Sequence, residues 1–320
     1  MSQLPPITHI IGILYNRLGN MNELNRSVDG NDGVSINRNL SEPRYLEQNF
    51  THFDVVGVSV GTGGTLGEDA LHSHKTDSGV RIAMVDAISF DRRDDDSSYL
   101  STGRVHAEVV ASCLAKHDSV PTALDAAKSE LTAINEQREL KGQELVKSDP
   151  PHFPFGVIEL STSHKGQVYF KPTVQADISM MAWFPGLAKR IIGGNARVVY
   201  FEPGMNRRIV YQSPPIPVPK GTLIIAASDG GIRALFKPSV LKAGGFVLSA
   251  ADHEELEKTA ISIDTITNIP VAKRDFNRLA RRLLGLLHDS DTSIRKMAQA
   301  IAVGDTGDDD ATIVFCRVKK

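Results

Sequence analysis

Acidic side chains stand at the ends of four apolar stretches of this 320-residue chain. The acids are Glu68 with Asp69, Asp86, Asp229, and Asp309 with Asp310. If the apolar stretches are strands of shared sheets, their ends meet at one rim and the carboxylates converge. A cluster of carboxylate oxygens, without His or Cys at metal spacing, suits Mg²⁺ or Mn²⁺. Two such ions about 3.5–4 Å apart can activate water and clamp phosphoryl oxygens. The acids are therefore either solvated turn residues or the ligands of a two-metal site that can carry out phosphoryl chemistry.

Strands have to position these acids. β-Branched and aromatic residues predict strands at 54–60, 70–74, 80–85, 222–227 and 312–316. The strands at 70–74 and 80–85 form one predicted hairpin, which returns Asp69 and Asp86 to the same rim. Gly230 and Gly231 follow Asp229, and they let the backbone approach a ligand closely.

The remaining pattern predicts an α+β fold, with two packed antiparallel sheets flanked by helices. Helical periodicity marks 105–117, 123–140, 249–262, 274–287 and 294–302. Further strands are expected at 156–160, 167–170 and 174–182, and a hairpin at 197–201 and 208–211. The stretch 19–49 is rich in Asn, Gly, Ser and Asp, so residues 1–53 are expected to form a partly ordered arm, and 54–320 one catalytic domain.

Composition narrows the classes of partner and compartment. Apolar residues make up 41% of the chain and charged residues 23%, which is ordinary for a globular protein with a core. The net charge of −2 gives no reason to expect nucleic acid as the main partner. Cys113 and Cys316 lie in apolar runs and read as buried thiols, and no signal peptide or membrane span is recognised. We therefore expect a cytoplasmic protein, with secretion by a signal-independent route left open.

Several motifs resemble those of the PP2C-type (PPM) metal-dependent protein phosphatases. They are Gly57-x-Ser59-x-Gly61, Glu68-Asp69-Ala70, Val85-Asp86, Ala227-Ser228-Asp229-Gly230, and Asp309-Asp310-Ala311-Thr312, in the family's order over 54–318. The resemblance implies an αββα sandwich that hydrolyses phosphoesters on proteins, most often phosphoserine and phosphothreonine. It also implies two Mn²⁺ or Mg²⁺ ions held by Asp69 (or Glu68), Asp86, Asp229, Asp309 and the Ala87 carbonyl. Asp86 and Asp229 are expected to matter most for catalysis.

Three positions depart from the family's pattern, one of them Asp310, which stands where many members have Asn. Gly64 stands where the family usually has a phosphate-binding Arg, and Ala87-Ile88-Ser89-Phe90 lacks the His of Asp-Gly-His-Gly-Gly. Three outcomes are compatible with this: a phosphatase with a substitute Arg or His, an enzyme that removes another phosphoester such as AMP from a protein, or a metal-binding pseudophosphatase. The candidate substitutes are Arg81, Arg92, Arg93 and Arg104 for the Arg, and His72 or His74 for the His.

A rival interpretation starts from Gly61-x-Gly63-Gly64-x-x-Gly67, which follows a predicted strand. This spacing is similar to a dinucleotide-binding fingerprint and would indicate an oxidoreductase. The next two residues, Glu68 and Asp69, would repel a pyrophosphate, and the later chain lacks βαβ alternation. The rival also gives no role to Asp229 or to the Asp308–Asp310 cluster.

Overall fold

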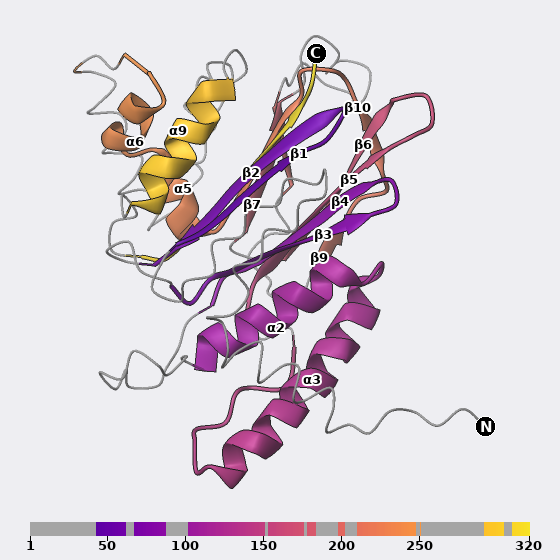
Figure 1. Cartoon of the computed structure of the whole chain (residues 1–320), viewed down its shortest axis with the longest axis vertical. Coiled ribbons are helices and arrows are strands. Elements are labelled where there is room, and N and C mark those ends of the chain that lie inside the picture. The colour runs from indigo at the N-terminus through magenta and orange to yellow at the C-terminus, as the bar shows by residue number, and fades with distance from the viewer. Residues whose placement is uncertain are drawn as a thin grey trace, which may run out of the picture.

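The computed structural model describes residues 43–61, 67–87, 102–150, 153–175, 178–183, 198–201, 210–247, 250, 291–303 and 309–320. In this part of the chain, two β-sheets pack face to face between two layers of helices (Figure 1). The fold class predicted from the sequence, an α+β sandwich of two antiparallel sheets flanked by helices, is therefore confirmed.

The first sheet carries the last strand of the chain in its interior. Its strands, in spatial order, are β1 (Arg44–Asn49), β2 (Phe53–Val60), β12 (Ala311–Val318), β11 (Leu223–Ala227), β7 (Ser179–Trp183) and β8 (Val198–Phe201). β2, β11 and β12 read as nearly continuous apolar runs because helices cover one of their faces and the second sheet covers the other. All of the pairings within this sheet are antiparallel.

The second sheet ends on the strand that follows Glu68 and Asp69. Its order is β10 (Ile216–Val218), β6 (Val168–Gln175), β5 (Phe155–Thr162), β4 (Gly79–Val85) and β3 (Ala70–Thr76), and β9 (Val210–Gln212) also pairs with β6. β3 therefore lies at an edge of this sheet. Its pairing with β4 is antiparallel, as the predicted hairpin requires.

Helices cover the outer face of each sheet. On the first sheet lie α5 (Asp229–Leu235), α6 (Pro238–Ala243) and α9 (Asp291–Ala302), which share a core with β2, β11 and β12. On the second lies α2 (Thr102–Lys116), and α3 (Val120–Leu140) packs against α2; Leu114 and Leu131 of these helices belong to one core with residues of β3, β4 and β5. A third core, including Val55, Ile82 and Val314, fills the space between the sheets.

Most predicted elements are present, but one pairing is wrong. The stretches at 197–201 and 208–211 were expected to form a hairpin, whereas β8 pairs with β7 in the first sheet and β9 with β6 in the second. Longer neighbouring strands pair with each short strand, and tertiary pairing overrides a local turn signal. The antiparallel pairing of both sheets is also incompatible with the parallel sheet of the dinucleotide-binding rival.

Some of the predicted segments lie partly or wholly outside the residues that the structure describes. β1 falls within the 1–53 stretch that was assigned to an arm, whereas residues 1–42 and the helices expected at 249–262 and 274–287 lie outside, apart from residue 250. Among the described helices, none is both long and apolar enough to cross a membrane.

Candidate functional site

The ends of four strands meet at one rim of the sandwich. In the first sheet, Ala311 of β12 pairs with Val60 of β2, and Ile313 pairs with Ala227 of β11. This register brings Asp309 and Asp310, before β12, close to the helix that starts at Asp229. In the second sheet, Ala70 pairs with Val85, so the residues just outside this pair, Asp69 and Asp86, lie at the adjacent ends of β3 and β4.

Asp69 is the most deeply buried of these acids, with 1% of its surface exposed. Its Oδ1 accepts a hydrogen bond from the Ala87 N–H at 3.2 Å, whereas its buried Oδ2 has no hydrogen-bond partner among the described residues. Burial raises the pKa of Asp69 to about 7, and repulsion from Asp310 and Asp309 adds to the rise, although the nearby Ser228 hydroxyl opposes it. A negative charge at Asp69 therefore lacks sufficient compensation from the chain itself.

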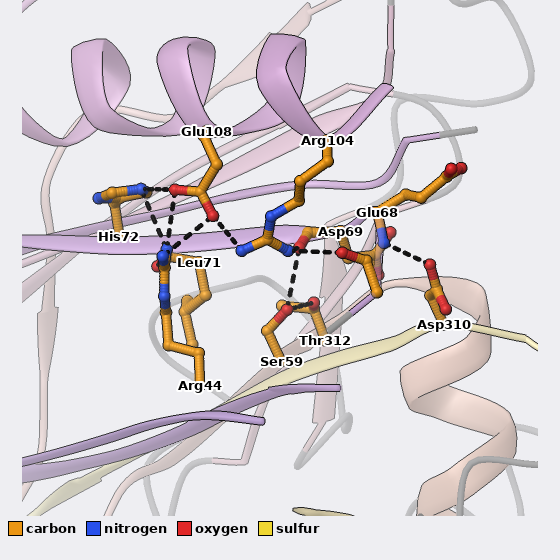
Figure 2. A network of polar contacts seen from close by, with 11 residues as sticks. Arg44, Ser59, Glu68, Asp69, Leu71, His72, Arg104, Glu108, Asp310 and Thr312 are labelled. Atoms are coloured by element: carbon orange, nitrogen blue, oxygen red, sulfur yellow. Dashed lines mark hydrogen bonds and ion pairs between the residues drawn. The ribbon is translucent and has the colours of Figure 1, made fainter. Parts of the chain in front are cut away.

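Three buried hydroxyl side chains join the two sheets beneath these acids. Ser59 of β2 donates to the Asp69 carbonyl at 3.1 Å, and Thr312 of β12 donates to the Ser59 hydroxyl at 2.9 Å (Figure 2). Ser228, the N-cap of α5, accepts from the Thr312 N–H at 3.0 Å. This chain of hydrogen bonds connects the start of β3 to the start of β12 and to α5.

Glycines let Asp310 approach the other acids. Its Oδ2 accepts from the Glu68 N–H at 2.5 Å. A Cβ on Gly67 would lie 2.5 Å from the Asp310 carboxyl carbon, and a Cβ on Gly230 would lie 1.9 Å from the Asp310 carbonyl oxygen. Since no larger residue fits at either position, Gly67 and Gly230 form a cradle that holds Asp310 between Glu68 and α5.

Arg233 lies between two of the predicted metal ligands. Its Nη2 donates to Asp229 Oδ2 and, at 2.7 Å, to Asp309 Oδ2. Burial raises the pKa of Asp309, and repulsion from Asp229 adds to this, although Arg233 opposes it. The guanidinium thus occupies a position where the surrounding carboxylates favour a cation.

The predicted ligands gather at this rim, but they do not converge on one point. Among the described residues, no group of three or more His, Cys, Asp or Glu side chains could hold a metal ion. The donors nevertheless fit a hard divalent cation in type and charge, because Asp69 has a buried oxygen without a partner and the acids raise one another's pKa values. Asp86 is half-buried at the end of β4, and its N–H donates to the Pro154 carbonyl at 3.0 Å.

The candidate substitutes for the family's Arg and His lie elsewhere. Arg81 is buried on β4, where it donates to Glu159 at 2.7 Å and to the His117 carbonyl. Arg104 is buried on α2 and bonds the Gly67 and Asp69 carbonyls. His72 contacts Glu108, His74 is exposed, and Arg92, Arg93 and Gly64 lie outside the described residues.

Arg233 is the residue at the rim that sequence reasoning missed. It stands four residues after Asp229, the spacing at which opposite charges meet on a helix. No helix was predicted after the strand at 222–227, whereas Ser228 caps a helix that begins directly at Asp229.

Comparisons with solved structures find several similar proteins. The chain is similar to RsbX, crystallised with magnesium, at 10% identity and a TM-score of 0.46, over 86% of this chain and all of RsbX. It is similar to the serine/threonine phosphatase PstP of Mycobacterium tuberculosis at 12% identity and a TM-score of 0.39, over 84% of this chain and all of that one. PppA, a regulatory component of the T6SS in Pseudomonas aeruginosa, gives 11% identity and a TM-score of 0.41, over 84% of this chain and 98% of PppA.

At 10–12% identity and TM-scores of 0.39–0.46, these similarities carry no conclusion about the function of this chain. No protein-family model and no curated protein sequence matches the chain.

Proposed function

We propose that this chain is an Mn²⁺- or Mg²⁺-dependent hydrolase of phosphoesters on proteins, and specifically a serine/threonine protein phosphatase. The observation that carries the proposal is the buried Asp69 carboxylate, which lies at the rim where the acids of both sheets gather and has one oxygen without a partner. A carboxylate with a raised pKa in such a cluster is typical of a site that binds a cation.

Asp69 or Glu68, Asp86, Asp229 and Asp309 would hold the ions, together with the Ala87 carbonyl. A bound divalent ion supplies Lewis acidity and lowers the pKa of a coordinated water. RsbX with magnesium and PstP with two manganese ions are precedents among the similar structures. The buried hydroxyls of Ser59, Ser228 and Thr312 would keep the strand ends in register, so that these donors stay close together.

Arg233 would bind the phosphoryl group of the substrate. Its side chain is 24% exposed and reaches the acids from α5, whereas Arg81 and Arg104 are buried in contacts with other parts of the chain. A guanidinium can bond two phosphoryl oxygens at once. Once an ion replaces the guanidinium between Asp229 and Asp309, Arg233 would therefore be free to serve as the phosphate-binding Arg whose usual position is occupied here by Gly64.

Hydrolysis of an aryl phosphate, with and without Mn²⁺, is the direct test. We expect turnover that EDTA abolishes and that Asp86→Asn, Asp229→Asn and Asp309→Asn each reduce at least 100-fold. The matched control is Asp54→Asn, since Asp54 lies at the other end of β2 and pairs with Lys319 at 3.0 Å. If all three rim variants fold and retain metal-dependent turnover, the assignment of the site is wrong.

The two remaining alternatives are decided by the substrate. The altered positions Gly64 and Ala87–Phe90 are where the family contacts its substrate, so a phosphopeptide and an AMP-modified peptide should be compared directly. Turnover of the AMP-modified peptide alone would indicate an enzyme that removes nucleotides from proteins. Mn²⁺ binding without turnover of either would indicate a pseudophosphatase.

A further inference from the structure

An unusual set of side chains closes the free edge of β3. Since β3 is the last strand of its sheet, every second backbone carbonyl on its outer side has no neighbouring strand to bond. Leu71 of β3 carries one such carbonyl, and the carbonyls of Gly67 and Asp69 belong to the residues just before the strand. Each of the three instead accepts a hydrogen bond from an arginine.

Two arginines from different elements share these three carbonyls. Arg104 of α2 donates to the Gly67 carbonyl at 2.9 Å and to the Asp69 carbonyl, while Arg44 of β1 donates to the Leu71 carbonyl at 2.8 Å. Glu108 lies between them: it accepts from Arg104 and forms an ion pair with Arg44 at 3.0 Å (Figure 2). We call Arg44, Arg104 and Glu108 the edge clamp.

The arginines of the edge clamp are held in place, and Glu108 offsets part of their positive charge. Arg104 is 2% exposed, and its planar guanidinium fixes the two carbonyls on either side of Glu68 relative to each other. Although burial opposes the ionisation of Glu108, Arg104 and Arg44 hold its pKa well below the usual range. His72 adds a further contact to Glu108. Glu108 therefore offsets part of the positive charge of the two arginines within the protein.

The clamp holds the backbone segment that carries the Glu68 and Asp69 side chains. Between Gly67 and Asp69 the chain carries Glu68, and the carbonyl of Asp69 is also bonded by Ser59. We propose that the edge clamp is a positioning device, which holds the backbone of Glu68 and Asp69 so that their carboxylates face the rim. This role rests on the proposed metal-dependent function. It also makes α2 and β1 determinants of the affinity for metal, although neither supplies a ligand.

The matched control is another Arg–Glu pair with a buried arginine, formed by Arg81 of β4 and Glu159 of β5. Arg81 is 4% exposed and pairs with Glu159 at 2.7 Å, but its contacts are with 117–118 and not with the rim. Arg104→Met and Glu108→Gln are compared with Arg81→Met and Glu159→Gln. Glu108→Gln is nearly isosteric, and it serves if Arg104→Met fails to fold.

Two measurements test the clamp, and the first needs no metal. Amide hydrogen exchange in EDTA-treated protein should become at least 10-fold faster at 67–71 in the clamp variants and remain unchanged there in the controls. The affinity for Mn²⁺, measured by calorimetry, should fall about 10–100-fold, as it does when groups that orient metal ligands are removed. The KM for an aryl phosphate should change less than 3-fold, because the clamp does not contact substrate.

The results separate this proposal from the proposed function. Clamp variants that match the controls in exchange at 67–71 and in Mn²⁺ affinity would overturn the positioning role while metal-dependent hydrolysis by the wild type still stands. A wild-type protein that neither binds Mn²⁺ nor hydrolyses phosphoesters would overturn the proposed function. In that case the exchange rates alone would decide whether the clamp orders the start of β3.

Discussion

Replacing Arg233 with Gln should strengthen metal binding and weaken catalysis at the same time. Arg233 forms ion pairs with Asp229 and Asp309, two residues that we expect to bind metal. An ion that enters the site has to displace these pairs. A substrate phosphoryl group, in contrast, would gain from the freed guanidinium. The two effects of Arg233→Gln therefore have opposite signs.

The partial exposure of the carboxylates sets the magnitude. The side chains of Asp229 and Asp309 are 44% and 41% exposed, so each pair is screened by solvent. Exposed ion pairs contribute about 0.2–1 kcal/mol each. Two pairs that share one guanidinium give about 0.5–2 kcal/mol, which corresponds to an increase of about 2–30-fold in the affinity for Mn²⁺.

Isothermal titration of metal-free protein with Mn²⁺ measures the increase in affinity, and phosphatase kinetics measure the loss in kcat/KM. A lost charge-assisted hydrogen bond to phosphate costs about 1.5–3 kcal/mol, so kcat/KM should fall roughly 10–100-fold. Arg233→Lys keeps the positive charge, so its affinity for Mn²⁺ and its kcat/KM should lie between those of the wild type and Arg233→Gln. Arg295→Gln is the control, because Arg295 pairs with Glu47 at 3.0 Å and its side chain is 45% exposed. An Arg233→Gln protein that binds Mn²⁺ no more tightly than the wild type would refute the competition.

Three further substitutions test the rim. Asp69→Asn should raise the melting temperature of EDTA-treated protein at pH 8 by about 3 °C or more, and it should abolish the further rise caused by Mn²⁺. Burial raises the pKa of Asp69 to about 7. The destabilising cost of its charge is therefore largely absent at pH 4 and complete at pH 8. Gly230→Ala should destabilise the protein by about 1–3 kcal/mol in urea unfolding and weaken Mn²⁺ binding, because the added Cβ meets the Asp310 carbonyl oxygen. Thr312→Val should cost about 1–2 kcal/mol in the same assay, because the buried Ser59 hydroxyl loses its donor; an unchanged midpoint would show that this bond contributes nothing.

The strands and the rim were predictable because local rules determine them. β-Branched runs mark β2, β11 and β12, and hydrophobic periodicity marks α2 and α3. An acid at the end of each strand needs only the correct pairing to reach a shared edge. The hairpin of β3 and β4 supplies that pairing for Asp69 and Asp86.

Contacts between distant side chains were not predictable, since no periodicity encodes them. Arg44 lies in a stretch that composition assigned to an arm, and it reaches Glu108 from 64 positions away. Arg104 was one of four candidates for the phosphate-binding Arg, whereas in the structure it is buried and bonds backbone carbonyls. The wrong hairpin between β8 and β9 has the same origin, because a turn signal says nothing about which longer strand competes for each partner.

The rim is where this chain departs from what would stabilise it most. Asp69, Asp309 and Asp310 repel one another in a partly buried setting, and the cradle of Gly67 and Gly230 allows the approach that makes this repulsion possible. Elsewhere in the described part of the chain, several buried charges are paired with opposite charges, as Arg44 and Arg104 are with Glu108. Local conflicts of this kind concentrate at functional sites. Because a bound cation would relieve the repulsion that folding has left in place, the same arrangement that lowers the stability of the metal-free protein would raise its affinity for metal.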